Sequence, residues 1–263
     1  MDYILNHVSE LESHYLKSIS RLFFLDYDGT LEPYDDDRKS DAPSKDVMSM
    51  LINLASDDSN QVIIISGRKR TDLDWFTDLP VMLVAEHGGF HKKYGEEWTT
   101  YFDENVEWKT KAYSVLLALT LQYDGSFIDE KHYSLTWHYG QSMEVISENE
   151  RRRIIAAINL LPFRNEFFVY DQDQAIEFRT KGIDKGRFAK HFIREERSDF
   201  VFAVGDGVTD EDLFEGIGKA NFTVKVGQGV GSSARFFLAD QREVIPLLNK
   251  CVQLSQRLQG KIR

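Results

Sequence analysis

One stretch decides the fold that we predict for this chain, Arg21-Leu22-Phe23-Phe24-Leu25-Asp26-Tyr27-Asp28-Gly29-Thr30-Leu31. Its first half is a continuous apolar run, which is typical of a strand buried on both faces of a parallel sheet. Two carboxylates follow, and carboxylates cannot stay inside a dry sheet without partners. We therefore expect Asp26 and Asp28 at the carboxyl end of a strand, where open α/β sheets bind ligands.

The two carboxylates also predict a bound cation. Residues i and i+2 of an extended strand point to the same face, and Gly29 allows a sharp turn directly afterwards. Like charges at this spacing need a cation or a shared proton, and carboxylate oxygens suit a divalent metal ion.

The composition limits the remaining functional classes. The 263 residues are enough for one large domain or two modest ones, and a hydrophobic content of 42% can form a real core. The net charge of −11 argues against a general binder of nucleic acid or membrane surfaces. With Cys251 as the single cysteine, no disulfide can form within the chain. Residues 1–20 do not resemble a signal peptide and no apolar stretch reaches membrane-spanning length, so we expect a cytoplasmic protein.

Apolar strands alternate with helical patterns at both ends of the chain. We expect a loop over 33–46, with Ser44 as the N-cap of the helix that follows it. The expected strands cover 22–25, 61–65, 81–85, 199–204, 223–226 and 236–238. The expected helices cover 1–20, 44–55, 184–195 and the segment from about 242. This alternation predicts a doubly wound parallel sheet of the Rossmann-like α/β class.

The pattern changes between residues 103 and 182. There we expect helices over 104–122 and 147–160 and strands over 126–130, 133–139, 166–170 and 174–178. This α-β-β-α-β-β order predicts an antiparallel sheet with helices on one face. We therefore predict a core of residues 1–102 and 183–263, an inserted α/β domain of residues 103–182, and linkers near 102–106 and 179–184.

Polar residues follow four of the expected parallel strands and should meet at one edge of the sheet. They are Asp26 and Asp28, Ser66-Gly67-Arg68, Glu86-His87-Gly88, and Asp206 with Asp210. Lys185 lies at the start of a helix on the same side, although Lys181 is an alternative. Carboxylates, a hydroxyl and an ammonium group are the set that phosphoryl transfer requires. Read one at a time, Ser66–Arg68 is also compatible with a turn, and the later aspartates with helix caps.

These residues resemble the four motifs of the haloacid dehalogenase superfamily of phosphohydrolases, in the same order along the chain. Other stretches look like the trehalose-6-phosphate phosphatase family, which removes the phosphate from trehalose 6-phosphate in trehalose synthesis and carries an inserted α/β cap. They are Asp28-Gly29-Thr30-Leu31-Glu32-Pro33, Ala85-Glu86-His87-Gly88, Ser134-Leu135-x-x-His138-Tyr139 and Glu177-Phe178-Arg179.

The resemblance implies a role for each matching residue. Asp26 would be the nucleophile that forms an aspartyl-phosphate, and Asp28 the general acid and base. Mg²⁺ would be held by Asp26, the backbone carbonyl of Asp28 and Asp206, with Asp210 in support. The phosphoryl group would be bound by Ser66, Gly67 and Lys185. The sugar would be bound by Arg68, Glu86, His87 and Gly88 from the core and by Glu130, Lys131 and Glu177 from the cap.

Three positions depart from the pattern of that family, namely Gly140, Thr180 and Gly207. Gly207 replaces an aspartate, so we expect weaker support of the metal, while the other two affect sugar recognition. Glu86 and His87 also fit a structural role, and a one-residue shift of a cap strand would reverse the face of its candidates. The alternatives are a phosphatase of sucrose 6-phosphate or mannosyl-phosphoglycerate, or a non-catalytic sugar-phosphate-binding subunit that regulates a synthase. A trehalose-6-phosphate synthase is a candidate protein partner.

Overall fold

The computed structural model describes residues 1–33, 42–141, 146–172, 174–229 and 231–260. The chain forms two compact units, and each is described here by itself. Unit 1 consists of Met1–Tyr101 and Asp184–Arg263, and unit 2 consists of Phe102–Ile183. Most of the loop expected over 33–46 lies outside the described residues.

Unit 1 is built on an eight-stranded sheet with the order β1-β12-β11-β10-β2-β3-β4-β5. All neighbouring strands are parallel except β4 and β5. The strands are β1 (Asp2–Tyr3), β2 (Arg21–Leu25), β3 (Asn60–Ile65), β4 (Met82–Ala85), β5 (Phe90–Lys92), β10 (Phe200–Gly205), β11 (Phe222–Val226) and β12 (Phe236–Leu238).

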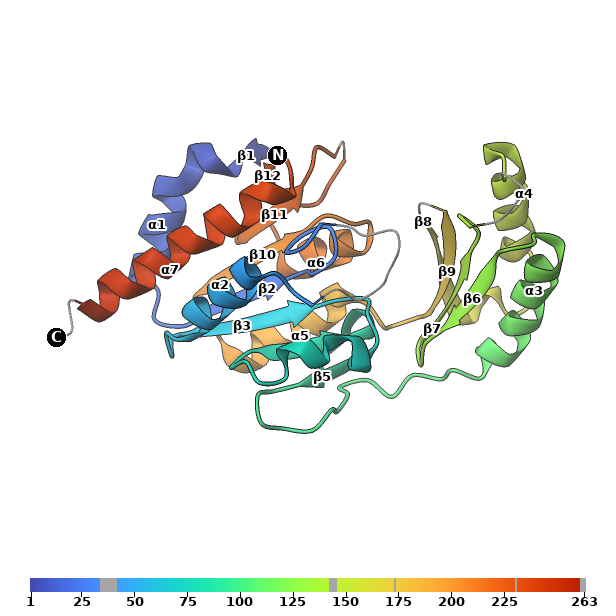
Figure 1. Ribbon diagram of the computed structural model, residues 1–263, viewed down its shortest axis with the longest axis horizontal. Coiled ribbons are helices and arrows are strands. Elements are labelled where there is room, and N and C mark those ends of the chain that lie inside the picture. Colours follow the sequence, from blue (N-terminus) through green and yellow to red (C-terminus); the bar gives the residue numbers. More distant parts are fainter. Residues whose placement is uncertain (34–41, 142–145, 173, 230, 261–263) are drawn as a thin grey trace. The chain divides into compact units, whose positions relative to one another are not determined.

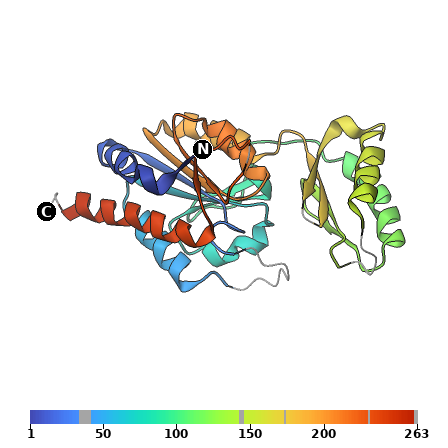
Figure 2. The same ribbon diagram turned by 90° about the horizontal axis from the view of Figure 1, so that it is seen from above.

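Helices cover both faces of this sheet, as Figures 1 and 2 show. One face is covered by α1 (Val8–Lys17), α2 (Lys45–Ala55) and α7 (Val244–Gly260), and the other by α5 (Lys185–Glu196) and α6 (Thr209–Ile217). Short 3₁₀ segments are η1 (Ile4–His7), η2 (Arg70–Phe76), η3 (Glu86–Gly88) and η5 (Gln241–Glu243). The predicted doubly wound α/β fold is therefore confirmed.

The apolar run of β2 divides its side chains between these two layers. Phe23 and Leu25 belong to the core beneath α1, α2 and α7, whereas Leu22 and Phe24 belong to the core beneath α5 and α6. A strand with period two can bury both sets only in the middle of a sheet. Because β2 lies between β10 and β3, the residues that follow these three strands emerge side by side.

Unit 2 is an antiparallel sheet with the order β6-β7-β9-β8. Its strands are β6 (Phe127–Glu130), β7 (Ser134–His138), β8 (Phe167–Gln172) and β9 (Ala175–Thr180), and η4 (Arg164–Glu166) precedes β8. The helices α3 (Trp108–Gln122) and α4 (Glu148–Asn159) lie on one face (Figure 1). Trp108, Trp137 and Phe178 form part of the apolar core between the helices and the sheet.

The ends of the sheet differ from the expectation. The helix predicted over 1–20 is interrupted at its start, because Asp2–Tyr3 forms a strand that pairs with β12 and Ile4–His7 forms a 3₁₀ helix. The antiparallel edge strand β5 was not predicted either. Neither strand has a continuous apolar run, since β1 is Asp2-Tyr3 and β5 is Phe90-His91-Lys92. The predicted N-cap of α2 is confirmed, since Ser44 Oγ accepts the amide hydrogen of Val47 at 3.3 Å.

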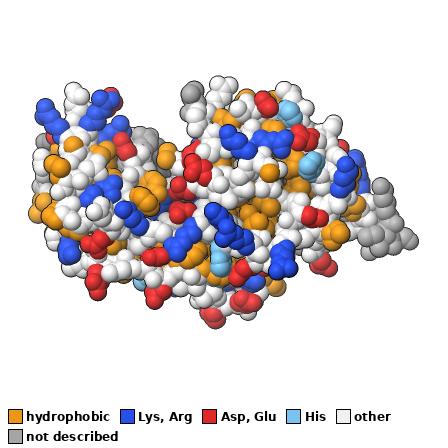
Figure 3. Space-filling model, turned by 180° about the vertical axis from the view of Figure 1, so that it is seen from behind, with side chains coloured by type: hydrophobic (Ala, Val, Ile, Leu, Met, Phe, Trp, Pro, Cys, Tyr) orange, Lys and Arg blue, Asp and Glu red, His pale blue; other side chains and the backbone are white. Residues whose placement is uncertain are grey.

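Among the described residues, no helix is both long and apolar enough to span a membrane. Figure 3 shows acidic and basic side chains interspersed over one face of the molecule.

Candidate active site

A buried ion cluster lies at the carboxyl end of β2. Lys185 Nζ donates to Asp26 Oδ1 at 2.6 Å and to Asp210 Oδ1 at 2.7 Å. The three side chains come from the end of β2, the start of α5 and the first turn of α6. Their side chains are 8%, 2% and 1% exposed, so solvent screens the cluster only weakly.

Asp206 joins this cluster through a hydroxyl group. Thr30 Oγ1 lies 3.3 Å from Asp26 Oδ2 and 3.2 Å from Asp206 Oδ1. Gly29, at φ +74°, passes so close to Asp206 that a Cβ at this position would lie 2.3 Å from Oδ2. Only glycine combines this positive φ with this close approach.

The cluster has more negative than positive charge. Burial lowers the pKa of Lys185, but Asp210 and Asp26 outweigh this effect, so its pKa is raised and it stays protonated. Burial and the neighbouring Asp210 raise the pKa of Asp26 well above its usual value, against the opposite effect of Lys185. Burial and Asp210 likewise raise the pKa of Asp206. An ionised Asp26 therefore requires a further positive charge nearby.

The same donor set fits a divalent cation. Carboxylate oxygens of Asp26, Asp206 and Asp210 lie within 4.8 Å of one another. Hard cations such as Mg²⁺ prefer oxygen ligands and commonly use one or two carboxylates at phosphate sites. A divalent cation would also offset the charge that one ammonium group leaves uncompensated among three carboxylates.

The position of Lys185 depends on close packing between α5 and α6. Asp184 caps α5 by accepting the amide hydrogen of Arg187 at 2.7 Å. A Cβ at Gly186 would lie 1.9 Å from the carbonyl oxygen of Asp212, so the two helices could not approach as they do. The alternative candidate, Lys181, belongs to unit 2 and lies over the ring of Phe168.

Asp28 lies outside the metal-binding group and pairs with Arg68. Nη2 of Arg68 is 2.6 Å from Asp28 Oδ1, and Nε is 2.9 Å from Oδ2. This bidentate geometry fixes the plane of the carboxylate. Arg68 also lies over the ring of Tyr27, with Cζ 4.8 Å from the ring centre.

The segment after β4 supports the segment after β3. The amide of His87 donates to the carbonyl of Ser66, and the amide of Glu86 donates to the carbonyl of Arg68, both at 2.9 Å. Glu86 and His87 have φ values of 49° and 58°, a left-handed conformation that costs energy in residues other than glycine. The ring of His87 also lies where a Cβ at Gly67 would be, 2.5 Å from Cε1. These contacts give both residues a structural role; their substrate contacts remain predictions.

In unit 2 the strand register divides the predicted sugar-binding residues between the two faces of the sheet. Glu130 pairs with Leu135, whose face is covered by α3 and α4, and its carboxylate lies 2.8 Å from Lys109 Nζ. Asp129 pairs with Thr136, which in turn pairs with Glu177 on the opposite face. The register therefore places Asp129, and not the predicted Glu130, on the same face of the sheet as Glu177.

Lys131 follows β6, and its Nζ lies 3.9 Å from Asp129. Glu177 also accepts a hydrogen bond from Gln172 at 2.8 Å. Acidic, basic and amide groups are thus gathered on the face that α3 and α4 leave uncovered.

Two of the three departures from the family pattern have local explanations. Gly140 passes close to Gln174, because a Cβ would lie 1.9 Å from its Oε1. Thr180 Oγ1 accepts a hydrogen bond from Trp108 Nε1 at 3.1 Å and so joins β9 to α3.

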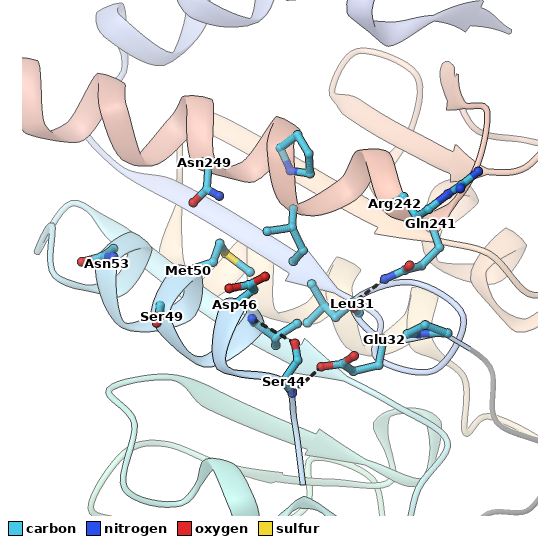
Figure 4. A pocket seen from close by; sticks show the side chains of 14 residues that line it. Leu31, Glu32, Ser44, Asp46, Ser49, Met50, Asn53, Gln241, Arg242 and Asn249 are labelled. Carbon is cyan, nitrogen blue, oxygen red and sulfur yellow. Dashed lines mark hydrogen bonds between the residues drawn. The ribbon is translucent and has the colours of Figure 1, made fainter. Parts of the chain in front are cut away.

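A pocket of about 600 Å³ lies between α2, α7 and the segment after β2 (Figure 4). Gln241 Nε2 donates to the carbonyl of Leu31 at 2.8 Å, and Glu32 Oε1 accepts from the amide of Ser44 at 2.6 Å. None of the predicted catalytic residues lines this pocket. The chemistry is therefore better placed at the buried cluster, where carboxylates, a hydroxyl and an ammonium group meet.

The class of protein follows from this fold and site. The structure superimposes on that of a haloacid dehalogenase-like hydrolase from Bacillus subtilis with a TM-score of 0.62 and 14% identity, covering 87% of this chain and 98% of that one. It thus has the fold of a haloacid dehalogenase-like hydrolase. The trehalose-phosphatase family pattern matches residues 24–242, so the chain belongs to that family of phosphatases.

Two relatives agree with this assignment. The C-terminal domain of C. albicans trehalose-6-phosphate phosphatase is 30% identical with a TM-score of 0.84, covering 93% of this chain and 96% of that one. The bifunctional trehalose-6-phosphate synthase/phosphatase of Thermoproteus tenax is 35% identical over 244 residues, 92% of this chain and 33% of the relative. The chain spans about a third of the length of the curated relatives it matches. The family resemblance inferred from the motifs is confirmed.

Some residues of the site were not predicted. Thr30 is part of the quoted motif, but only the structure shows that its hydroxyl joins Asp26 to Asp206. Asp129 could be recognised as a candidate only from the pairing register of β6 with β7. Lys225 contacts the main chain of Asp206, and its only signal was a charged residue near the carboxyl end of a predicted strand.

Proposed function

We propose that this chain is a Mg²⁺-dependent phosphatase that hydrolyses trehalose 6-phosphate to trehalose and phosphate through an aspartyl-phosphate intermediate. The proposal is carried by the buried contact of Asp26 with Lys185 and Asp210 in a chain of the trehalose-phosphatase family. A carboxylate at the end of a parallel strand, next to a fixed ammonium group, is suited to attack a phosphoryl group.

The first half of the reaction transfers the phosphoryl group to the protein. An oxygen of Asp26 forms a bond to phosphorus while the bond between phosphorus and sugar oxygen O6 breaks. Asp28 gives its proton to O6, so that trehalose leaves as a neutral alcohol. Lys185, at the start of α5, and Ser66, directly after β3, bind the oxygens of the transferred group.

The second half releases phosphate. Asp28, now ionised, removes a proton from water as the water oxygen attacks phosphorus, and the bond to Asp26 breaks. When bound, Mg²⁺ would stabilise negative charge on the phosphoryl oxygens. Asp26, Asp206 and the main-chain carbonyl of Asp28 would hold it, with Asp210 in support.

We assign the recognition of the sugar to unit 2, which would act as a cap. The face of its sheet that α3 and α4 leave uncovered carries Asp129, Lys131 and Glu177, groups that hydrogen-bond sugar hydroxyls. The segments near 102–106 and 179–184 would act as linkers, and closure would exclude water from the reacting phosphoryl group.

The substrate is tested by phosphate release from a panel of sugar phosphates with Mg²⁺ present. We expect trehalose 6-phosphate to have a higher kcat/KM than sucrose 6-phosphate, mannosyl-phosphoglycerate and glucose 6-phosphate. Equal or better turnover of another compound would reject the substrate assignment. Asp26→Asn should lower kcat by about 10⁴-fold or more, as expected for loss of a nucleophile.

The same panel of sugar phosphates distinguishes an enzyme from the non-catalytic alternative. A chain that binds trehalose 6-phosphate but releases no phosphate would be a regulatory subunit. A synthase partner and a cytoplasmic location belong to the proposal as well. The partner is supported by the bifunctional synthase/phosphatase among the relatives, and co-purification with a trehalose-6-phosphate synthase would test it.

A further inference from the structure

Lys225 occupies a defined place beside the candidate cation site. Its Nζ donates to the main-chain carbonyl of Asp206, and a second carbonyl, that of Gly207, lies 3.3 Å away. The side chain is only 13% exposed. An ammonium group that binds two consecutive carbonyls holds the orientation of the peptide between them.

The strand register explains why Lys225 reaches these carbonyls. Lys225 lies on β11 directly beside Gly205 of β10, the residue before Asp206. Val224 and Val226 point into the core beneath α1, α2 and α7, so Lys225 points to the other face, where α5 and α6 lie. This is also the face of Lys185 and Asp210.

Two further contacts restrain the segment that Lys225 holds: the amide of Asp210 donates to the carbonyl of Gly207 at 3.3 Å, and Thr30 Oγ1 lies 3.2 Å from Asp206 Oδ1. Gly207 donates its amide hydrogen to Asp210 Oδ2 at 2.9 Å but has no side chain with which to fix the turn. A Cβ at this position would come no nearer than 3.5 Å to any residue other than its two chain neighbours, so a β-carbon would fit. The glycine is therefore not required by space. Asp206 is contacted from outside the segment at its carboxylate by Thr30 and at its main chain by Lys225.

Glu211 is a charged neighbour of Lys225, with its Oε1 3.9 Å from Nζ. Its carboxylate already accepts hydrogen bonds from Ser232 Oγ and from the amide of Ser233. Glu211 thus joins Lys225 to the segment after β11, while the closer contacts of the ammonium group are those to the carbonyls.

We propose that Lys225 is a positioning residue, which holds the main chain of Asp206 and Gly207 so that the Asp206 carboxylate faces the cation site. The inference rests on the proposed function, because it assigns that site to Mg²⁺. Groups that orient metal ligands usually change metal affinity or activity 10- to 100-fold when they are removed.

The test uses the direction in which Mg²⁺ affinity changes. If Lys225 acted only through its charge, its removal would strengthen cation binding, since a nearby positive charge is lost. If it positions Asp206, Lys225→Met should weaken Mg²⁺ binding about tenfold. Lys225→Gln should do the same, because its side chain is too short to reach both carbonyls. Lys225→Arg should stay within about threefold of the unaltered chain, because it retains the charge and the donors.

Mg²⁺ binding is measured by titration calorimetry without substrate, and the thermal unfolding midpoint of each variant is recorded. Lys219→Met is the matched control, because this lysine is exposed and makes no ion pair among the described residues. Unchanged or tighter Mg²⁺ binding in a folded Lys225→Met or Lys225→Gln variant would overturn the inference, even if trehalose 6-phosphate is hydrolysed. Weaker binding in both, in a chain that hydrolyses another phosphate ester, would support the inference and reject only the proposed substrate.

Discussion

The guanidinium group of Arg68 holds both carboxylate oxygens of Asp28, the residue to which we assign proton transfer. Arg68→Lys keeps the charge but loses the planar fork, so the orientation of Asp28 should be less well fixed. We expect kcat for trehalose 6-phosphate to fall about tenfold while KM changes little, as for a misplaced general acid.

A substrate with a good leaving group tests this reading of Arg68. The hydrolysis of p-nitrophenyl phosphate needs little proton donation, so its rate should be nearly unchanged in Arg68→Lys. Arg70→Lys is the control, since the guanidinium group of Arg70 stacks on the ring of Phe90. A rise in KM with kcat unchanged would instead make Arg68 a substrate contact.

Lys185 should be essential for stability as well as activity. Lys185→Met leaves the buried carboxylates of Asp26 and Asp210 facing each other without their shared cation. Removing one partner from a buried ionic group costs about 3–5 kcal/mol, so the free energy of unfolding at pH 7 should fall by this order. Urea unfolding measures the loss, with the exposed Lys190→Met as control. A loss no larger than in the control would show that the carboxylates do not depend on Lys185.

The register of β6 predicts which neighbouring acid recognises the sugar. Asp129→Asn should raise KM for trehalose 6-phosphate about tenfold, since a hydrogen bond to a charged group is worth about 1.5–3 kcal/mol. Glu130→Gln should have little effect, because Glu130 pairs with Lys109 on the helix-covered face. Neither change should affect p-nitrophenyl phosphate. The opposite ranking of the two variants would place the register one residue away.

His91 should make the fold sensitive to acid. Burial lowers its pKa from 6.5 to about 4. Its ring stacks on that of Tyr101, with 4.0 Å between the two ring centres. The unfolded chain takes up a proton near pH 6.5 and the folded chain only near pH 4, so the free energy of unfolding falls as pH decreases through this window. The loss is at most about 3 kcal/mol, the value for the full shift.

Replacement of His91 isolates this contribution. The stability of His91→Phe should decrease less than that of the unaltered chain between pH 7 and pH 4.5, as measured by urea unfolding at each pH. The exposed His14→Phe serves as control. Equal pH dependence of all three chains would exclude His91 as the source.

Sequence patterns predict the strands and the position of the site where these depend on local apolar runs. The apolar runs of β2, β3 and β10 predict burial on both faces, which is typical of central strands in a parallel sheet. This places Asp26, Lys185, Asp206 and Asp210 at one edge, where the structure brings them together. Their catalytic roles stay predictions.

Other features depend on how strands that are distant in the sequence pair, which a local sequence pattern does not predict. Glu130 and Asp129 have similar chemistry and differ only in the face of the sheet, which the pairing of β6 with β7 decides. Lys225 was missed for a related reason, because its contacts depend on the alignment of β11 with β10. The edge strands β1 and β5 are held by their neighbours and have no apolar run of their own.

The position of β2 in the sheet has a consequence for synthesis of the chain on the ribosome. Its neighbour β3 is made soon after it, but its other neighbour, β10, emerges only after the whole of unit 2. Until then, one edge of the apolar strand Leu22–Leu25 has no partner, and unpaired apolar edges promote aggregation. This edge is therefore open to aggregation while more than a hundred further residues are translated.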